Sequence, residues 1–213
     1  MTVLLLIRHA LCDPVGRSIA GRKPGIHLNP AGRSQAAALA NRLAVLPISA
    51  IYSSPMERAR ETAEPVAQRL GLKVQTEPGL DEIDFGEWTG RTLAELDVIP
   101  AWRAFNEERS TTRIPGGELI GEVLERALEA CGRISRTHRN PGAVVALVSH
   151  GDVLRALIAH FAGISLDLMR RIELSPASLS VVSLGPYPRL LLLNSTEAWP
   201  EEVLPNAGGE ARA

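Results

Sequence analysis

The chain is poor in cysteine. Only Cys12 and Cys131 occur in 213 residues, too few for the disulfide framework that holds many small secreted proteins together. A disulfide scaffold is therefore excluded, and we expect both thiols to be reduced, as in a cytoplasmic protein.

Long apolar runs are also missing. The longest cover residues 3–7 and 143–148, which is the length of a strand and far short of a membrane-spanning helix. No basic segment precedes the first run, so the N-terminus does not resemble a secretory signal peptide. We therefore expect a cytoplasmic location and no membrane partner.

Neither sign of charge is in excess. The chain has 23 Lys and Arg residues and 24 Asp and Glu residues, which are interspersed and leave a formal net charge of −1. Nucleic acids and anionic membranes attract strongly basic surfaces, so this balance gives no reason to expect either partner. With 45% hydrophobic and 22% charged residues, the composition is that of an ordinary globular protein.

Hydrophobic periodicity predicts strands that alternate with helices. Apolar, β-favouring runs predict strands at 3–7, 48–54, 72–76 and 142–148. Helices are predicted over 31–46, 54–72 and 152–161, and a long amphipathic helix follows Gly116-Gly117. Asn29-Pro30 is typical of a helix start, and Ser54 to Glu57 has the spacing of a capping box. Residues 177–195 predict an antiparallel hairpin that turns at Gly185-Pro186.

This order of elements predicts an α/β fold. We expect a three-layer α/β/α sandwich with a mostly parallel central sheet, a C-terminal antiparallel hairpin and a small helical lid. The predicted domain covers residues 1–199 with the lid inserted at about 86–117, and residues 200–213 form a loose tail. The hairpin could pair with a second copy of the chain, giving a homodimer.

Two of the apolar strands end on histidine. His9 follows Arg8 at the end of the first strand, and His150 follows the strand at 142–148. Ligands of open α/β sheets bind at the carboxyl ends of the strands. Arg58 follows another strand within the first turn of its helix, so two guanidinium and two imidazole groups are predicted to converge. Such a set suits a phosphoryl group, because arginine matches its oxygens with paired donors.

Simpler interpretations stay open at this point. A histidine at a strand end is often only a polar loop residue. His9 and His150 could bind a metal, although no carboxylate or cysteine lies beside either one at ligand spacing. Cys12 could be a nucleophile, but no base or helix start stands near it in the sequence, which favours an incidental thiol. His27, His138 and His160 are interpreted as surface or helix-end residues.

Six segments in order resemble one known family: "LLLIRHA", "HLNPAGRSQA", "IYSSPMERARETA", "LDEIDFGEWTG", "PGGE" and "LVSHGDVLRAL". Together they resemble the histidine phosphatase superfamily, the phosphoglycerate mutase-like group, over residues from about 3 to 195. The similarity is greatest to its compact phosphatase branch. No single motif is specific, but six at compatible spacing strengthen the phosphate hypothesis.

The resemblance implies a role for each matching residue. His9 corresponds to the nucleophile that becomes phosphohistidine, and Arg8, Arg58 and His150 correspond to the phosphate pocket. Glu82 corresponds to the proton donor, with Asp84 as the fallback. Gly86, in the same motif, is expected to turn the loop. No cofactor and no metal is implied.

Two departures from the family pattern concern the segment after His9. Ala10 stands where the family usually has glycine, which is expected to be tolerated if its φ is negative. The asparagine that often contacts phosphate would fall near Val15, which cannot do so. Our candidates for substrate binding are therefore Arg17, Ser18, Gly21 and Arg22.

The leading functional hypothesis is a phosphatase of small phosphomonoesters that forms a phosphohistidine. A phosphoglycerate mutase is the first alternative, and a non-catalytic protein that binds phosphorylated ligands is the second. A mutase must protect its intermediate from water, and the short predicted lid argues against that. The small phosphorylated substrate itself is not identified by any motif.

Overall fold

Six strands form one sheet in the order β3-β2-β4-β1-β5-β6. The structure, a computed structural model, describes residues 2–140 and 142–197. The strands are β1 (Thr2–Arg8), β2 (Ile48–Ser53), β3 (Val74–Thr76), β4 (Val144–Ser149), β5 (Leu179–Leu184) and β6 (Arg189–Ser195). β1 lies parallel to β4, and β2 lies parallel to both β3 and β4. β5 is antiparallel to β1 and to β6, with which it forms the hairpin. The predicted mostly parallel sheet with an antiparallel C-terminal hairpin is therefore confirmed.

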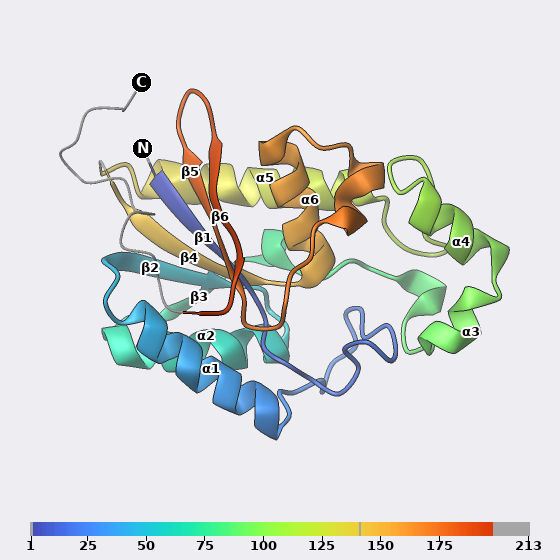
Figure 1. The fold of residues 1–213 in the computed structure, drawn as a ribbon, viewed down its shortest axis with the longest axis horizontal. Coiled ribbons are helices and arrows are strands. Elements are labelled where there is room, and N and C mark those ends of the chain that lie inside the picture. Colours follow the sequence, from blue (N-terminus) through green and yellow to red (C-terminus); the bar gives the residue numbers. More distant parts are fainter. Residues whose placement is uncertain (1, 141, 198–213) are drawn as a thin grey trace.

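Helices cover both faces of this sheet, which confirms the three-layer sandwich (Figure 1). On one face, α1 (Pro30–Leu43) and α2 (Glu57–Leu70) pack against Val3, Leu5 and Ile7 of β1. On the other, α5 (Ile120–Thr137) and α6 (Gly151–Ala162) pack against Leu4 and Leu6. Because side chains alternate along a strand, the unbroken apolar run from Val3 to Ile7 lets β1 contribute to both cores.

Of the two helix starts predicted from capping patterns, the structure confirms one and contradicts the other. Asn29 caps α1, since its side chain accepts a hydrogen bond from Gly32 N, and Pro30 occupies the first turn as predicted. The capping box predicted at Ser54 is wrong: α2 begins at Glu57 with Met56 as its N-cap and no side-chain cap. The Ser54 hydroxyl lies at the end of β2, where it bonds to side chains from distant segments.

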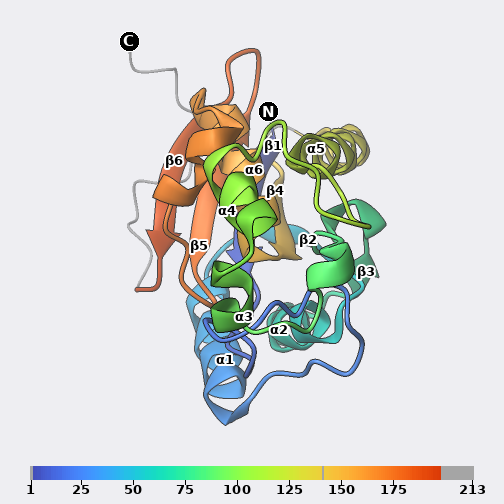
Figure 2. The same ribbon diagram turned by 90° about the vertical axis from the view of Figure 1, so that its right-hand side faces the viewer.

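The predicted lid region consists of short helices (Figure 2). They are η2 (Gly86–Trp88), α3 (Leu93–Asp97) and α4 (Pro100–Glu107), and one more short helix, η1 (Pro78–Leu80), precedes the region. Trp88 contacts Trp102 and Phe105 edge-to-face, with ring centroids 5.2 and 5.4 Å apart. All three rings belong to the α5–α6 core, so this region is anchored by packing. A further short helix, η3 (Leu166–Arg171), follows α6.

Gly86 turns the loop, as expected. Its φ is +45°, and a Cβ there would lie 2.2 Å from the Pro115 carbonyl oxygen. Both its conformation and its close backbone contact therefore require glycine. The chain then reaches α5, which begins at Ile120, a few residues after Gly116-Gly117.

No helix within the described ranges is long and apolar enough to cross a membrane. β6 is an edge strand of the sheet, and pairing of two copies through it stays a prediction. The division into one domain with an inserted lid also stays a prediction, and the predicted tail lies outside the described residues.

Candidate active site

A cavity of about 170 Å³ opens at the carboxyl ends of β1 and β4. β1 carries Arg8 and His9 to it, and the start of α6 lies beside them. The loop after β1, the first turn of α2 and the segment after η1 complete the lining. The lining residues are Arg8, His9, Cys12, Pro14, Val15, Gly16, Ser18, Ile19, Ala20, Gly21, Arg58, Glu82, Phe85, Leu93, Gly151, Asp152 and Arg155.

His9 presents one free ring nitrogen. Its Nδ1 lies 2.8 Å from the carbonyl oxygen of Ala10. A carbonyl only accepts hydrogen bonds, so Nδ1 is the donor and Nε2 carries the lone pair. Burial, and then the nearby charge of Arg58, lower the pKa of His9 to about 3. A neutral imidazole with an available nitrogen is the form that can act as a nucleophile.

Ala10 fits where the family pattern has glycine. Its φ is not positive, and its side chain is fully buried beside Leu28, Ala36 and Ala177. Ala10 N donates to Thr62 Oγ1 at 2.9 Å, which ties the end of β1 to α2. The methyl group therefore fills a small apolar space and leaves the backbone at His9 in place.

Arg8 and Arg58 each bring an unused donor to the cavity. Arg8 Nη1 bonds the carbonyl oxygen of Leu174, and Arg58 Nη2 bonds that of Gly21. Arg8 Nε and Arg58 Nη1 are buried and have no partner among the described residues. Buried polar groups are nearly always paired, so two cationic residues with unpartnered donors in the lining of one cavity make it suited to an anionic group. A Cβ on Gly151 would lie 3.3 Å from Arg8 Nε, so glycine there leaves room for the guanidinium.

His150 lies behind His9 and does not line the cavity. The two ring centroids are 5.2 Å apart, and His150 is fully buried. Arg58 Nη2 lies 3.2 Å from His150 Nδ1, and a guanidinium only donates, so the proton of His150 is on Nε2. That nitrogen lies 2.8 Å from Ser54 Oγ, which in turn donates to Asp81 Oδ1 at 3.2 Å. The Ser54 hydroxyl thus holds the ring and its tautomer.

Glu82 brings its carboxyl group close to both His150 and Arg58. Its Oε2 lies 3.4 Å from His150 Nδ1 and 3.7 Å from Arg58 Nη2. Burial raises the pKa of Glu82 to about 7, although the charge of Arg58 partly opposes the shift. A group with this pKa holds a proton for part of the time near neutral pH and can both give and take one. Asp84, the fallback, instead accepts a hydrogen bond from Gly86 N and does not line the cavity.

The loop that carries Glu82 is held by Arg126 of α5. Arg126 Nη1 bonds the carbonyl oxygens of Gly79 and Asp81, and Nη2 bonds that of Glu82. The remaining donors of the guanidinium bind both carboxylate oxygens of Glu118. All five N–H groups of one arginine are therefore used to hold this loop and its neighbour.

Two of the four candidate substrate-binding residues are not brought to the cavity. Ser18 and Gly21 line it, whereas Arg17 and Arg22 do not. Arg22 donates hydrogen bonds to the carbonyl oxygen of Glu82 and to the carboxylate of Glu118. These bonds help to hold the loop that carries Glu82. Its position in the sequence places Arg22 next to Gly21 of the cavity lining, but the sequence does not show the direction of its side chain.

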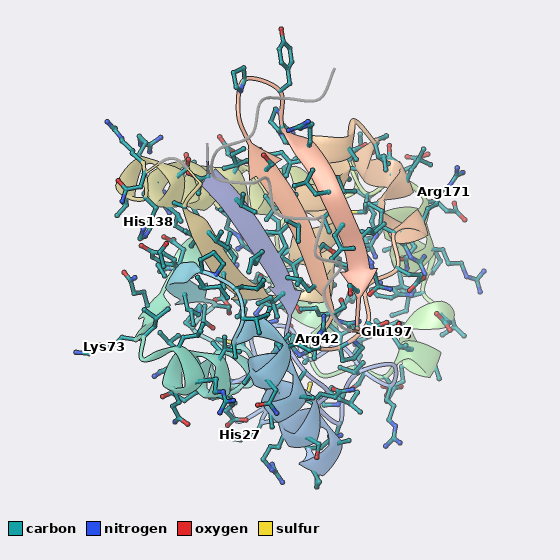
Figure 3. All side chains as sticks on the ribbon, turned by 60° about the vertical axis from the view of Figure 1, so that its left-hand side comes forward. His27, Arg42, Lys73, His138, Arg171 and Glu197 are labelled. Carbon is teal, nitrogen blue, oxygen red and sulfur yellow. The ribbon has the colours of Figure 1, made fainter. Side chains whose placement is uncertain are left out.

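The other reactive side chains do not join this cluster. Cys12 lines the cavity, but burial raises the pKa of its thiol, so it is a weak nucleophile. His27 is exposed and pairs with Glu61, and His138 contacts the Tyr52 hydroxyl. Figure 3 labels both histidines, which lie well apart from each other. Within the described part of the chain, no three His, Cys, Asp or Glu residues lie together as potential metal ligands.

Sequence reasoning missed an ion-pair cluster beside the cavity. Asp152 accepts hydrogen bonds from Arg109 and Arg155, each at 2.9 Å. Burial would raise the pKa of Asp152, but these two arginines hold it well below its usual range. Asp152 and Arg155 follow His150 closely within "SHGDVLRAL", which was the available signal, whereas Arg109 is distant in the sequence.

Comparison with known proteins gives a consistent result. The sequence matches the family described as "Histidine phosphatase superfamily (branch 1)" over residues 4–196. It is 32% identical over 201 residues to phosphoserine phosphatase 1 of Hydrogenobacter thermophilus, covering 92% of this chain and 93% of that protein. It is 34% identical over 196 residues to the probable phosphoglycerate mutase GpmB of Cronobacter sakazakii, covering 89% and 88%. The structure of alpha-ribazole phosphatase from Shigella flexneri superposes with a TM-score of 0.82 at 26% identity, covering 94% and 100%.

Proposed function

Since the chain belongs to the histidine phosphatase superfamily, we propose that it hydrolyses small phosphomonoesters through a phosphohistidine formed on His9. Its similarity to proteins named phosphatases is consistent with a phosphoric monoester hydrolase. The single observation that carries the proposal is one cavity lined by His9, whose Nδ1 is bonded and whose Nε2 carries the lone pair, and by Arg8 and Arg58, each with a buried donor that has no partner among the described residues.

In the first step, His9 Nε2 attacks phosphorus and the bond between phosphorus and the ester oxygen breaks. Arg8 and Arg58 balance the charge on the equatorial oxygens as the phosphoryl group moves. Protonated Glu82 gives its proton to the departing oxygen, because an alkoxide is a poor leaving group. The Nδ1–H bond to the Ala10 carbonyl stabilises the positive charge that develops on the imidazole ring.

In the second step, a water molecule attacks phosphorus and the bond to His9 Nε2 breaks. The Glu82 carboxylate takes a proton from this water, which restores both residues to their starting state. A raised pKa suits this alternation, because neither form of the carboxyl group is strongly favoured near neutral pH. We further propose that the enzyme acts in the cytoplasm, in keeping with its two free and buried cysteines.

The test is to trap and map the intermediate. The wild-type enzyme, mixed with a ³²P-labelled phosphomonoester and quenched in alkali, should carry acid-labile label on His9. His9→Ala should lose both the label and phosphatase activity, whereas His27→Ala, a change at an exposed histidine, should keep both. Full phosphatase activity in His9→Ala would refute the proposal. A folded wild-type protein that binds phosphate but is never labelled would support the non-catalytic alternative.

A phosphoglycerate mutase is the second candidate, because one relative carries that name. The two reactions share the first step and differ in the acceptor of the phosphoryl group. Labelled phosphoglycerate distinguishes them: inorganic phosphate is expected from the hydrolase, and relabelled phosphoglycerate from the mutase.

A further inference from the structure

The cavity has two chemically different parts. The part around His9 carries the two guanidinium groups with unused donors. Six of the remaining lining residues have larger side chains without charge and form the less polar part of the cavity. They are Cys12, Pro14, Val15, Ile19, Phe85 and Leu93, and we call these six the apolar wall. The other side chains of the lining, apart from Ala20, are the polar groups of Ser18, Glu82, Asp152 and Arg155. The alcohol part of a bound phosphomonoester would extend along the apolar wall.

Backbone hydrogen bonds hold the apolar wall in place. Ile19 N donates to the Arg91 carbonyl oxygen at 2.9 Å, and Gly90 N donates to that of Ile19 at 2.7 Å. Leu93 N donates to the carbonyl oxygen of Arg17 at 2.9 Å, and Ser18 pairs with Thr92. The loop after β1 and the start of α3 therefore form one rigid unit, which both views of the ribbon show side by side (Figures 1 and 2).

The third arginine of the cavity is already bonded to groups of the protein. Arg155 Nε bonds the Ile172 carbonyl oxygen at 2.8 Å, Nη1 bonds Asp152 at 2.9 Å, and Nη2 lies 3.8 Å from Glu173. Asp152 shares its negative charge with Arg109 as well. A second anionic group on the substrate would have to break this cluster to gain a partner.

The charges of the remaining groups match one phosphoryl group. Glu82 is protonated in the first step proposed above, so it does not offset the two positive charges of Arg8 and Arg58, and His9 is neutral because burial lowers its pKa. A phosphomonoester dianion therefore uses both free cations. A carboxylate placed against the apolar wall would lose water without gaining a charged partner, which is costly.

We infer that this enzyme selects phosphomonoesters whose alcohol part is uncharged and apolar, such as aryl or alkyl groups, and discriminates against those with a carboxylate. This inference rests on the proposed function and adds the substrate class to it. It also predicts that the chain differs in preference from a phosphatase of phosphoserine, whose substrate carries a carboxylate.

The test compares phenyl phosphate with 4-carboxyphenyl phosphate. The two esters have the same ring, and the para carboxylate does not make the phenol a worse leaving group, so chemistry does not favour phenyl phosphate. We expect kcat/KM for phenyl phosphate to be higher by about tenfold or more, because the carboxylate meets no free cation.

A charge added to the wall should reduce the preference. Val15 is half-buried in the cavity lining, and Val15→Arg should narrow the kcat/KM ratio of the two esters by about tenfold. Val45→Arg is the matched control: Val45 is 79% exposed and does not line the cavity, so this variant should keep the wild-type ratio. The wild-type ratio decides the question even if Val15→Arg does not fold.

Three results would overturn the inference. The first is equal or faster hydrolysis of the carboxylated ester, and the second is hydrolysis of phosphoserine at least as efficient as that of phenyl phosphate. The third is a folded Val15→Arg variant with an unchanged ratio. In each of these cases phosphatase activity remains, so the proposed function stands. If no phosphomonoester is hydrolysed and His9 is never labelled, the proposed function fails and this inference fails with it.

Discussion

Replacing Glu82 by glutamine should change stability and activity in opposite directions. The carboxyl group is 13% exposed and lies among groups that cannot fully replace its water. Burial raises its pKa from 4.5 to about 7. Glutamine keeps the shape of the side chain and cannot ionise. The variant should therefore be relieved of the cost of burying a carboxylate at neutral and alkaline pH.

The direction in which stability changes with pH follows from the number of protons that the folded and unfolded states bind. Between pH 4.5 and 7 the folded state keeps the proton on Glu82 more often than the unfolded state does. Wild-type stability is therefore lost as pH rises through this window, relative to a variant without the carboxyl group. For pKa values of 4.5 and about 7, the relative loss between pH 5 and pH 8 is about 2.5 kcal/mol.

Urea unfolding at pH 5, 6, 7 and 8 measures this difference. The free energy of unfolding of Glu82→Gln minus that of wild type should grow by about 2.5 kcal/mol across the series. Glu129→Gln, a change at a glutamate whose side chain is 66% exposed, should stay within about 0.5 kcal/mol of a constant offset. If the curves of wild type and Glu82→Gln run parallel, the raised pKa and the burial that causes it are refuted.

The same variant should lose activity according to the leaving group. Alkyl phosphates need a proton on the departing oxygen, so their hydrolysis should fall by about 10²–10⁴-fold. p-Nitrophenolate leaves with little protonation, so p-nitrophenyl phosphate should be affected much less. Equal losses for both substrates would contradict the role of Glu82 as the proton donor.

Three further predictions concern positioning, acid stability and the fold. Arg126→Lys removes most of the hydrogen bonds to the loop that carries Glu82, so it should lower kcat for alkyl phosphates more than for p-nitrophenyl phosphate. Arg133→Ala, a change at a half-exposed arginine of the same helix, should leave both kcat values close to those of wild type. Equal effects of the two changes on kcat would contradict the proposal that Arg126 positions Glu82. Burial lowers the pKa of His9 from 6.5 to about 3, so wild-type stability should fall by about 3 kcal/mol relative to His9→Asn between pH 7 and pH 4; acid titration followed by circular dichroism checks this, and parallel curves would oppose it. Asn29→Ala removes the cap of α1 and should lower the free energy of unfolding by about 1 kcal/mol in urea, with no loss in kcat, whereas unchanged stability would contradict the capping role.

Local signals predicted the elements well because their causes are local. The apolar run of β1, the Asn29-Pro30 start of α1 and the end of α6 at Gly163 each depend on neighbours within a few residues. A local signal gave a wrong prediction at Ser54, where the spacing to Glu57 predicted a capping box. The hydroxyl group has a partner 96 residues away, at His150, and no local pattern contains that partner.

The site was predicted in part. Placing His9 and Arg8 at the carboxyl end of a central strand required only the sheet rule and an apolar run. The choice between Glu82 and Asp84 followed from the resemblance alone, since two acids two residues apart give the same local pattern. The structure separates them because the Asp84 carboxylate bonds its own turn, while that of Glu82 lies beside His150.

By itself, the sequence determined the six strands and the four long helices, apart from some of their ends, and placed "RHA" at the end of a buried strand. Tertiary structure alone decided the pKa of Glu82, the tautomer of His150 and the inward or outward direction of the loop arginines. Secondary structure depends on contacts a few residues apart, whereas these properties depend on burial and on charges from segments distant in the chain. Arg126 shows the difference: it is an ordinary helix residue in the sequence, and in the folded protein it holds the loop of the proposed proton donor.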